Sequence, residues 1–166
     1  WSTEEMCEKL ETLGFIIDFA QRYNGWDTPS TGILAVKPLT DVKVGWITPI
    51  NYEAAQTRIR VLSINRWLRA RGYRSAIVNY PEIINQNYDV CIVGKTFDEH
   101  HYANIKLLKQ SGKTVICDIC EQITGPDFPY VDQILALCDL VVCCSRALEK
   151  VVQGINPNTV VIEDAF

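Results

Sequence analysis

Short continuous apolar runs alternate with helix-like segments from about residue 41 onward, and this alternation constrains the fold more than any other feature. The runs are rich in Val and Ile without a polar residue at every second position, which is typical of strands buried on both faces of a parallel sheet. Strands are expected at 43–50, 73–80, 88–95, 114–120, 140–144 and 159–164. Helices are expected at 53–72, 99–112, 130–139 and 145–154. This order predicts an α/β domain with a doubly wound, mostly parallel, Rossmann-like sheet over residues 41–166.

Residues 1–40 read as a separate, smaller part. Ser2 and Glu5 have the spacing of a capping box, which predicts the start of a helix. Two strands are expected after it, at 15–23 and 32–38. One helix and one hairpin bury too little surface to fold alone, so we expect this appendage to pack on another part of the protein.

Composition excludes several classes of function. The formal net charge is -4 and no block of Lys and Arg occurs, which argues against nucleic acid as a partner. No apolar run is long enough to span a membrane, and no export signal precedes the first helix. The seven cysteines are therefore expected to be reduced thiols of a cytoplasmic protein. Because the chain begins at Trp1, we interpret it as a piece of a longer, multidomain protein.

Ligands of doubly wound sheets bind outside the carboxyl ends of the strands, which gives a short list of candidate residues. The candidates after the first, third and fourth strands are Asn51, Arg58, Lys95, His100, Asp118 and Glu121. The first loop lacks both glycine-rich phosphate-binding motifs, so a dinucleotide-binding or P-loop function loses its main support. That loop is either a plain connection or a ligand loop from which Arg58 points toward an anion.

The paired histidines allow two interpretations. His100 titrates near neutrality and is a candidate general base. Alternatively, this is a solvated helix start, in which Asp98 is the N-cap and Glu99 faces the helix dipole.

Cys117 and Cys120 form a C-x-x-C pair that also has two readings. Such pairs bind metals or carry out redox chemistry when they lie in a knuckle or at a helix start. Here Cys117 lies inside a strand, which favours a buried structural thiol, and we expect no metal site. Asp118 must then point to the opposite face of the sheet, and we expect its carboxylate to face the ligand cleft.

The segment from Lys43 to Phe166 resembles the N-terminal half of a GT-B glycosyltransferase of the group 1 kind. The stretches that carry the resemblance are TRIRVLSINRWLRARGY, YDVCIVGK, LLKQSGKTVICDICE, CDLVVCCSRALEKVV and NTVVIEDAF. The resemblance implies transfer of a sugar from a nucleotide-sugar donor to an acceptor hydroxyl. It further implies that this half holds the sugar or glycan acceptor, that a following domain binds the donor, and that this piece alone is inactive.

By the same resemblance, the cleft residues are Asn51, Arg58, Lys95, His100 and Asp118, and Glu121 lies near them. The expected catalytic residues are His100 and Asp118, and the expected substrate-binding residues are Asn51, Arg58, Lys95 and Glu121. No cofactor is expected in this piece. The first loop departs from the family pattern because it has no Gly-Gly pair, which puts contact with the donor phosphates there in doubt.

Residues 1–40 resemble the end of a class I SAM-dependent methyltransferase, through TEEMCEKLETLGF and the closing AVKP. This resemblance implies a fusion of a methyltransferase with a glycosyltransferase. The alternative is a helix and hairpin private to the glycosyltransferase. Two rival functions stay open for the larger part, a non-catalytic Rossmann-like binding or scaffold domain and a C-x-x-C metal or redox protein. The free hairpin edge also predicts a homodimer.

Overall fold

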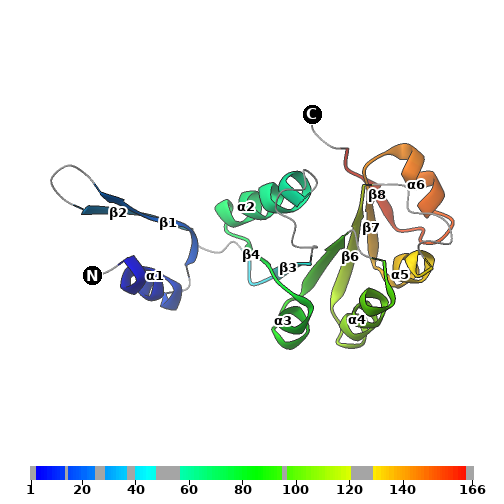
Figure 1. Cartoon of the computed structure of the whole chain (residues 1–166), viewed down its shortest axis with the longest axis horizontal. Coiled ribbons are helices and arrows are strands. Elements are labelled where there is room, and N and C mark those ends of the chain that lie inside the picture. Colours follow the sequence, from blue (N-terminus) through cyan, green and yellow to red (C-terminus); the bar gives the residue numbers. More distant parts are fainter. Residues whose placement is uncertain are drawn as a thin grey trace.

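The larger part of the chain forms one six-stranded sheet in which every strand is parallel to its neighbours (Figure 1). This computed structural model describes residues 3–13, 15–24, 29–36, 40–47, 57–94, 97–120 and 129–163. The strands, in spatial order, are β4 (Arg74–Ile77), β3 (Lys43–Ile47), β5 (Val90–Gly94), β6 (Thr114–Ile119), β7 (Leu140–Cys143) and β8 (Thr159–Val161). The predicted α/β fold with a parallel, Rossmann-like sheet is therefore confirmed.

The order of the strands places a topological switch point between β3 and β5. The chain runs from β3 to β4 on one side, then crosses back to β5 on the other side. β6, β7 and β8 follow outward from β5 in sequence order. In sheets of this kind the carboxyl ends of the two strands at the switch point flank the ligand crevice. Gly94 at the end of β5 pairs with Asp118 of β6, so Asp118 lies one strand away from that crevice.

The helices divide unequally between the two faces of the sheet. The helical elements of this part are η1 (Thr57–Leu62), a π-helical turn, and α2 (Ser63–Ala70), α3 (Tyr80–Asn85), α4 (Glu99–Gln110), α5 (Val131–Leu137) and α6 (Arg146–Val152). In Figure 1, α2 lies on one side of the sheet and α3 and α4 lie on the other. Side chains of α3 to α6 belong to one buried core, whereas no residue of α2 is fully buried. The core therefore lies on the α3–α6 face.

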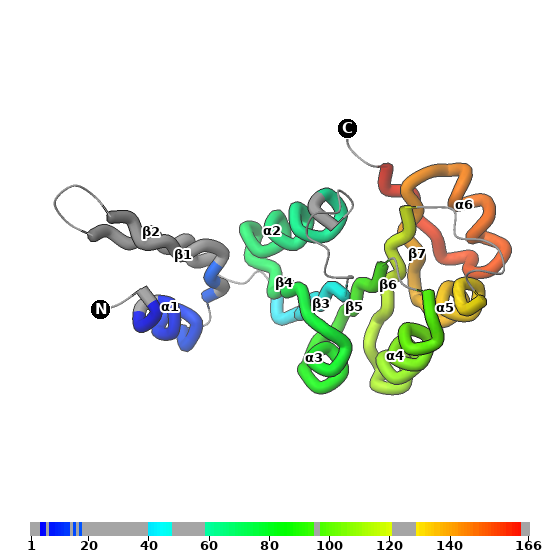
Figure 2. Tube along the Cα trace, viewed as in Figure 1, coloured from blue at the N-terminus to red at the C-terminus, as the bar shows by residue number. Residues whose placement is uncertain are grey.

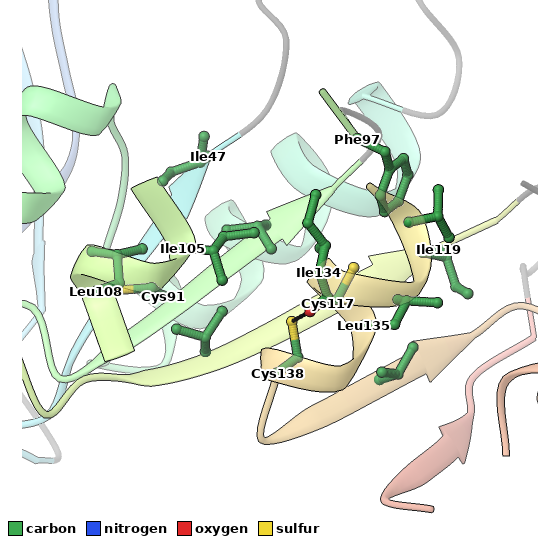
Figure 3. Close-up of a cluster of buried hydrophobic side chains, with 14 of the residues drawn as sticks. Ile47, Cys91, Phe97, Ile105, Leu108, Cys117, Ile119, Ile134, Leu135 and Cys138 are labelled. Carbon is green, nitrogen blue, oxygen red and sulfur yellow. Dashed lines mark hydrogen bonds between the residues drawn. The ribbon is translucent and has the colours of Figure 1, made fainter. Parts of the chain in front are cut away.

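Alternation along β6 shows how the sequence divides its side chains between the faces. Val115, Cys117 and Ile119 are buried, whereas Ile116 and Asp118 are only partly buried. The buried set packs against Ile134 and Leu135 of α5 and the rest of the core (Figure 3). The prediction that Asp118 and Cys117 point to opposite faces is confirmed.

Helix ends follow the local sequence signals. The Asp98 carboxylate accepts a hydrogen bond of 2.8 Å from the His101 amide, so the predicted N-cap of α4 is confirmed. Gly72 follows α2 with a φ of 81°, a left-handed conformation that suits glycine at a helix end.

One helix, α3, is absent from the sequence-based expectation. It begins at Asn79, whose side chain accepts a hydrogen bond of 2.9 Å from the Glu82 amide.

The appendage consists of α1 (Thr3–Thr12) and a hairpin of β1 (Ile16–Asn24) and β2 (Pro29–Val36). The two strands are antiparallel, as the sequence predicts, and form a sheet of their own. Ser2 of the predicted capping box lies outside the described residues. The Arg69 guanidinium of α2 donates a hydrogen bond to the Ile17 carbonyl, which joins the appendage to the larger part. α1 and α6 lie at opposite ends of the molecule (Figure 2).

Within the described part of the chain, no helix is both long enough and apolar enough to cross a membrane.

Candidate functional site

An apolar groove of about 490 Å³ lies on the sheet face that carries α2. We call it the open-face groove. Its floor is formed by strand side chains that point away from the core, namely Trp46, Ile92, Ile116, Leu140, Val142 and Val160. Its volume is within the range typical of pockets for small molecules.

The groove exists because the helices that the structure describes cover this face only partly. Parallel sheets normally have both faces covered, so an aliphatic face left open is unusual. Ile59 and Ile64, from η1 and α2, form one wall and are 49% and 39% exposed. At the β8 end of the groove, Val160 and Ile162 are 38% and 53% exposed. Large apolar side chains on both sides of a groove are the mark of a binding surface.

A buried ion pair lies where the groove reaches the carboxyl end of β6. Arg60 Nη2 is 2.6 Å from Asp118 Oδ1, and Arg60 Nε donates a hydrogen bond of 2.9 Å to Asp118 Oδ2. The two side chains are only 8% and 15% exposed. This two-pronged geometry is the strongest form of an arginine–carboxylate pair. It fixes the direction of both side chains at the edge of an otherwise apolar groove.

The helical segment that carries Arg60 is itself anchored to the sheet. Trp46 Nε1 donates a hydrogen bond of 2.8 Å to Ser75 Oγ, and Ser75 Oγ donates one of 2.7 Å to Asn65 Oδ1. This chain links β3, β4 and α2 through polar groups at least partly withdrawn from water. The wall of the groove is therefore held in place by more than apolar contact.

Asp118 is the predicted site residue that the structure places in the groove. His100 lies near the start of α4, is exposed, and is not among the side chains that line the groove. Asn51, Lys95 and Glu121 lie outside the described residues. The backbone of Arg58 belongs to η1, and its side chain lies outside the described part. The partner of Asp118 is instead Arg60, which sequence reasoning did not single out.

His101, the neighbour of His100, has the more unusual surroundings. Its ring lies edge-on to the Tyr80 ring, with 4.8 Å between the ring centroids. His101 Nε2 and the Tyr80 hydroxyl are both buried, and neither has a hydrogen-bond partner among the described residues. Burial lowers the pKa of His101, against a smaller opposing effect of Asp98. Burial likewise raises the pKa of Tyr80 far above its ordinary value. Both rings are therefore neutral at physiological pH.

The cysteines of the sheet behave as buried apolar side chains. Burial raises the pKa of Cys91 and of Cys143 to about 11, so neither thiol ionises near neutrality. A hydrogen bond with Cys138, together with burial, raises the pKa of Cys117. The Cys138 thiol also donates to the Ile134 carbonyl at 3.2 Å (Figure 3). Among the described residues, no cluster of His, Cys, Asp and Glu side chains is suited to hold a metal ion. The burial of these cysteine side chains in the core favours a structural role for their thiols.

The arrangement can bind an apolar surface and present one charged, hydrogen-bonded pair at its end. Each Asp118 oxygen accepts one hydrogen bond from Arg60 and keeps a lone pair for another donor. A bound hydroxyl group can therefore donate to Asp118 without displacing Arg60.

Comparison with known proteins adds no assignment, since no protein-family model, no curated protein and no solved structure matches the chain.

Proposed function

We propose that residues 41–166 form the acceptor-side half of a GT-B glycosyltransferase of the group 1 kind. The observation that carries the proposal is the open-face groove, which ends in the Arg60–Asp118 pair at the carboxyl end of a parallel sheet. That is where ligands bind in doubly wound folds. The reaction would transfer a sugar from a nucleotide-sugar donor, held by a second domain, to a hydroxyl of the acceptor. The bond between the sugar and the nucleoside diphosphate breaks, and the nucleoside diphosphate is the leaving group.

In this proposal Asp118 is the residue that handles the acceptor hydroxyl. Its carboxylate accepts a hydrogen bond from the hydroxyl and receives the proton as the new glycosidic bond forms. Arg60 keeps the carboxylate oriented toward the groove. His100 does not line the groove, so the base role falls to Asp118. The aliphatic floor favours a sugar or glycan acceptor that carries an apolar group.

The appendage is proposed to be the end of a SAM-dependent methyltransferase fused to the glycosyltransferase. A helix followed by an antiparallel hairpin is compatible with that origin. It is equally compatible with an appendage private to the glycosyltransferase. Deleting residues 1–40 distinguishes the two origins. A private appendage should be needed for the larger part to remain soluble and folded, whereas a methyltransferase tail should be dispensable for its folding.

The test of the proposed function is a panel of UDP-, GDP- and ADP-sugars assayed with the complete natural reading frame that contains this chain. Turnover of one donor, dependent on an acceptor and lost in Asp118→Asn, would support the proposal. Circular dichroism of the variant must show a native fold, so that loss of turnover reports on chemistry. Absence of turnover and of donor binding would contradict it.

A second candidate function is a non-catalytic domain that docks an apolar helix. The observation that favours it is the same aliphatic floor, which resembles a sheet face that lacks a covering helix. The panel separates the two functions because a docking domain turns over no donor.

A further inference from the structure

A second cavity, of about 510 Å³, lies away from the open-face groove, at the amino ends of β3 and β4. We call it the cationic cavity. Lys43 and Arg74, which line it, are the first residues of these two strands. Phe15 and Ile17 of the appendage also line it. The cavity therefore lies between the two parts of the chain, at the end of the sheet opposite to the Arg60–Asp118 pair.

Positive charge is concentrated in this cavity although the protein as a whole is acidic. Lys43, Arg69 and Arg74 line it, and Glu11 is the carboxylate among its lining side chains. The formal net charge of the chain is -4. The lining therefore carries three cations against one carboxylate, and this excess of positive charge favours an anionic ligand.

Arg74 gives the second observation. Its Nε is buried, and it has no hydrogen-bond partner within the described part of the chain. A buried donor of this kind is costly, and such groups are normally satisfied by protein, water or a ligand. The guanidinium of Arg69 is oriented by its hydrogen bond to the Ile17 carbonyl. An oxyanion in the cavity would meet the planar donor groups that the arginine side chains of the lining offer to phosphate.

The remaining walls are fixed and partly aromatic. Lys113 Nζ donates hydrogen bonds of 2.9 Å to the Gln86 carbonyl and 3.0 Å to the Tyr88 carbonyl, which holds the loop before β5. Phe15 and Tyr88 both contribute rings to the lining. A cavity of this volume is larger than an inorganic anion needs, and the rings offer a surface for an organic group.

We propose that the cationic cavity binds the phosphate group of a small phosphorylated molecule. Arg74 and Lys43 contact the phosphate oxygens, with Arg69 beside them. The organic part lies against Phe15 and Tyr88. This site is independent of the proposed glycosyl transfer because none of its lining residues belongs to the open-face groove.

The test is isothermal titration calorimetry of the purified chain with inorganic phosphate, pyrophosphate, and uridine and adenosine monophosphates. We expect saturable binding at one site. Arg74→Gln should weaken it at least about tenfold because it removes the charged guanidinium from the lining. The matched control is Arg66→Gln, since Arg66 is an exposed arginine of α2 and does not line the cavity. That variant should leave the affinity within about twofold, as expected for a distant, screened surface charge.

Thermal unfolding of each variant shows whether it is folded. If Arg74→Gln is not folded, Lys43→Gln takes its place in the titration. Tighter binding of a nucleoside monophosphate than of inorganic phosphate would support the site and identify a nucleotide as its source. Equal affinities would show that the organic part adds no contact, and would overturn its placement against Phe15 and Tyr88. No saturable binding, or equal weakening by Arg66→Gln and Arg74→Gln, would overturn the proposal.

Discussion

The Asp118 carboxylate lies near the end of a buried strand, where an unpaired charge is costly. Arg60 compensates that cost through two contacts, and neither side chain is more than 15% exposed. Arg60→Gln removes the cation that compensates the Asp118 charge, and Asp118→Asn removes the charge that the two Arg60 contacts neutralise. Asp118→Asn and Arg60→Gln are therefore expected to lower the free energy of unfolding by about 3 kcal/mol each, measured by urea denaturation.

The Lys109–Asp139 pair provides the matched control for this prediction. Its side chains are 29% and 41% exposed, so water screens the charges. Lys109→Gln should cost less than about 1 kcal/mol. A loss in Asp118→Asn no larger than that in Lys109→Gln would show that the Arg60–Asp118 pair does not stabilise the fold.

His101 should make stability depend on pH. Burial lowers its folded-state pKa below the ordinary value of 6.5, so the unfolded chain binds a proton more readily. This pKa difference contributes to the free energy of unfolding. The contribution is complete above about pH 6.5 and is lost as the pH falls toward the folded-state pKa of His101. Urea unfolding at about pH 7.5 and about pH 5.5 should therefore show a larger loss for the wild type than for His101→Phe. His100→Phe, at an exposed position, should match the wild type, and equal losses in all three would refute the prediction.

Residue by residue, the site was only partly predictable. Asp118 could be found because an acid at the end of an apolar strand must face a cleft or a partner. Arg60 could not be found from periodicity, because the π-helical turn η1 shifts side chains out of the α-helical register. The sequence offers His100 as the candidate base, yet the more buried of the two histidines is His101. Adjacent residues point in different directions on a helix, and only packing decides which one is buried.

At the scale of elements, the sequence-based expectation contains the strands but misses one crossover helix, α3. Continuous runs of Val and Ile have few alternatives to a buried parallel strand. The short helix α3 has no clear apolar period, but Asn79, Pro81 and Glu82 are cap signals that predict a helix start. The order of the strands depends on contacts between segments far apart in the chain, which local patterns do not record.

Gly45 shows how tightly β3 and α3 pack. A Cβ at this position would lie 2.6 Å from Ile83 Cδ1 and 3.2 Å from Tyr88 Cδ1. Ile83 is fully buried and has little room to move. Gly45→Ala should therefore lower the free energy of unfolding by roughly 1–3 kcal/mol in urea denaturation.

Gly154→Ala is the control for Gly45, because its Cβ would meet the Val151 carbonyl at an ordinary distance of 3.6 Å. It should leave stability unchanged within about 0.5 kcal/mol. Equal stabilities of the two variants would contradict the close packing of β3 on α3.

At the scale of the whole molecule, two surfaces are suited to bind a partner. They are the outer edges of the β1–β2 hairpin and the open-face groove. β1 and β2 pair only with each other among the described strands, so their outer edges are unpaired. Such edges pair readily with a second copy. Light scattering of the purified chain should show a dimer that forms as the concentration rises, and that is lost when residues 1–40 are deleted. A monomer at every concentration would contradict this prediction.

The second surface is the open-face groove, and filling it tests the proposed function most directly. Val160→Trp places a bulky ring at a groove position that is 38% exposed. Leu107→Trp adds the same ring at a position on α4 that is 47% exposed and outside the groove. The measurement is the rate of sugar transfer to an acceptor by the complete protein. We expect Val160→Trp to lower it at least about tenfold and Leu107→Trp to leave it unchanged. Equal rates in both variants would show that the groove is not the acceptor site.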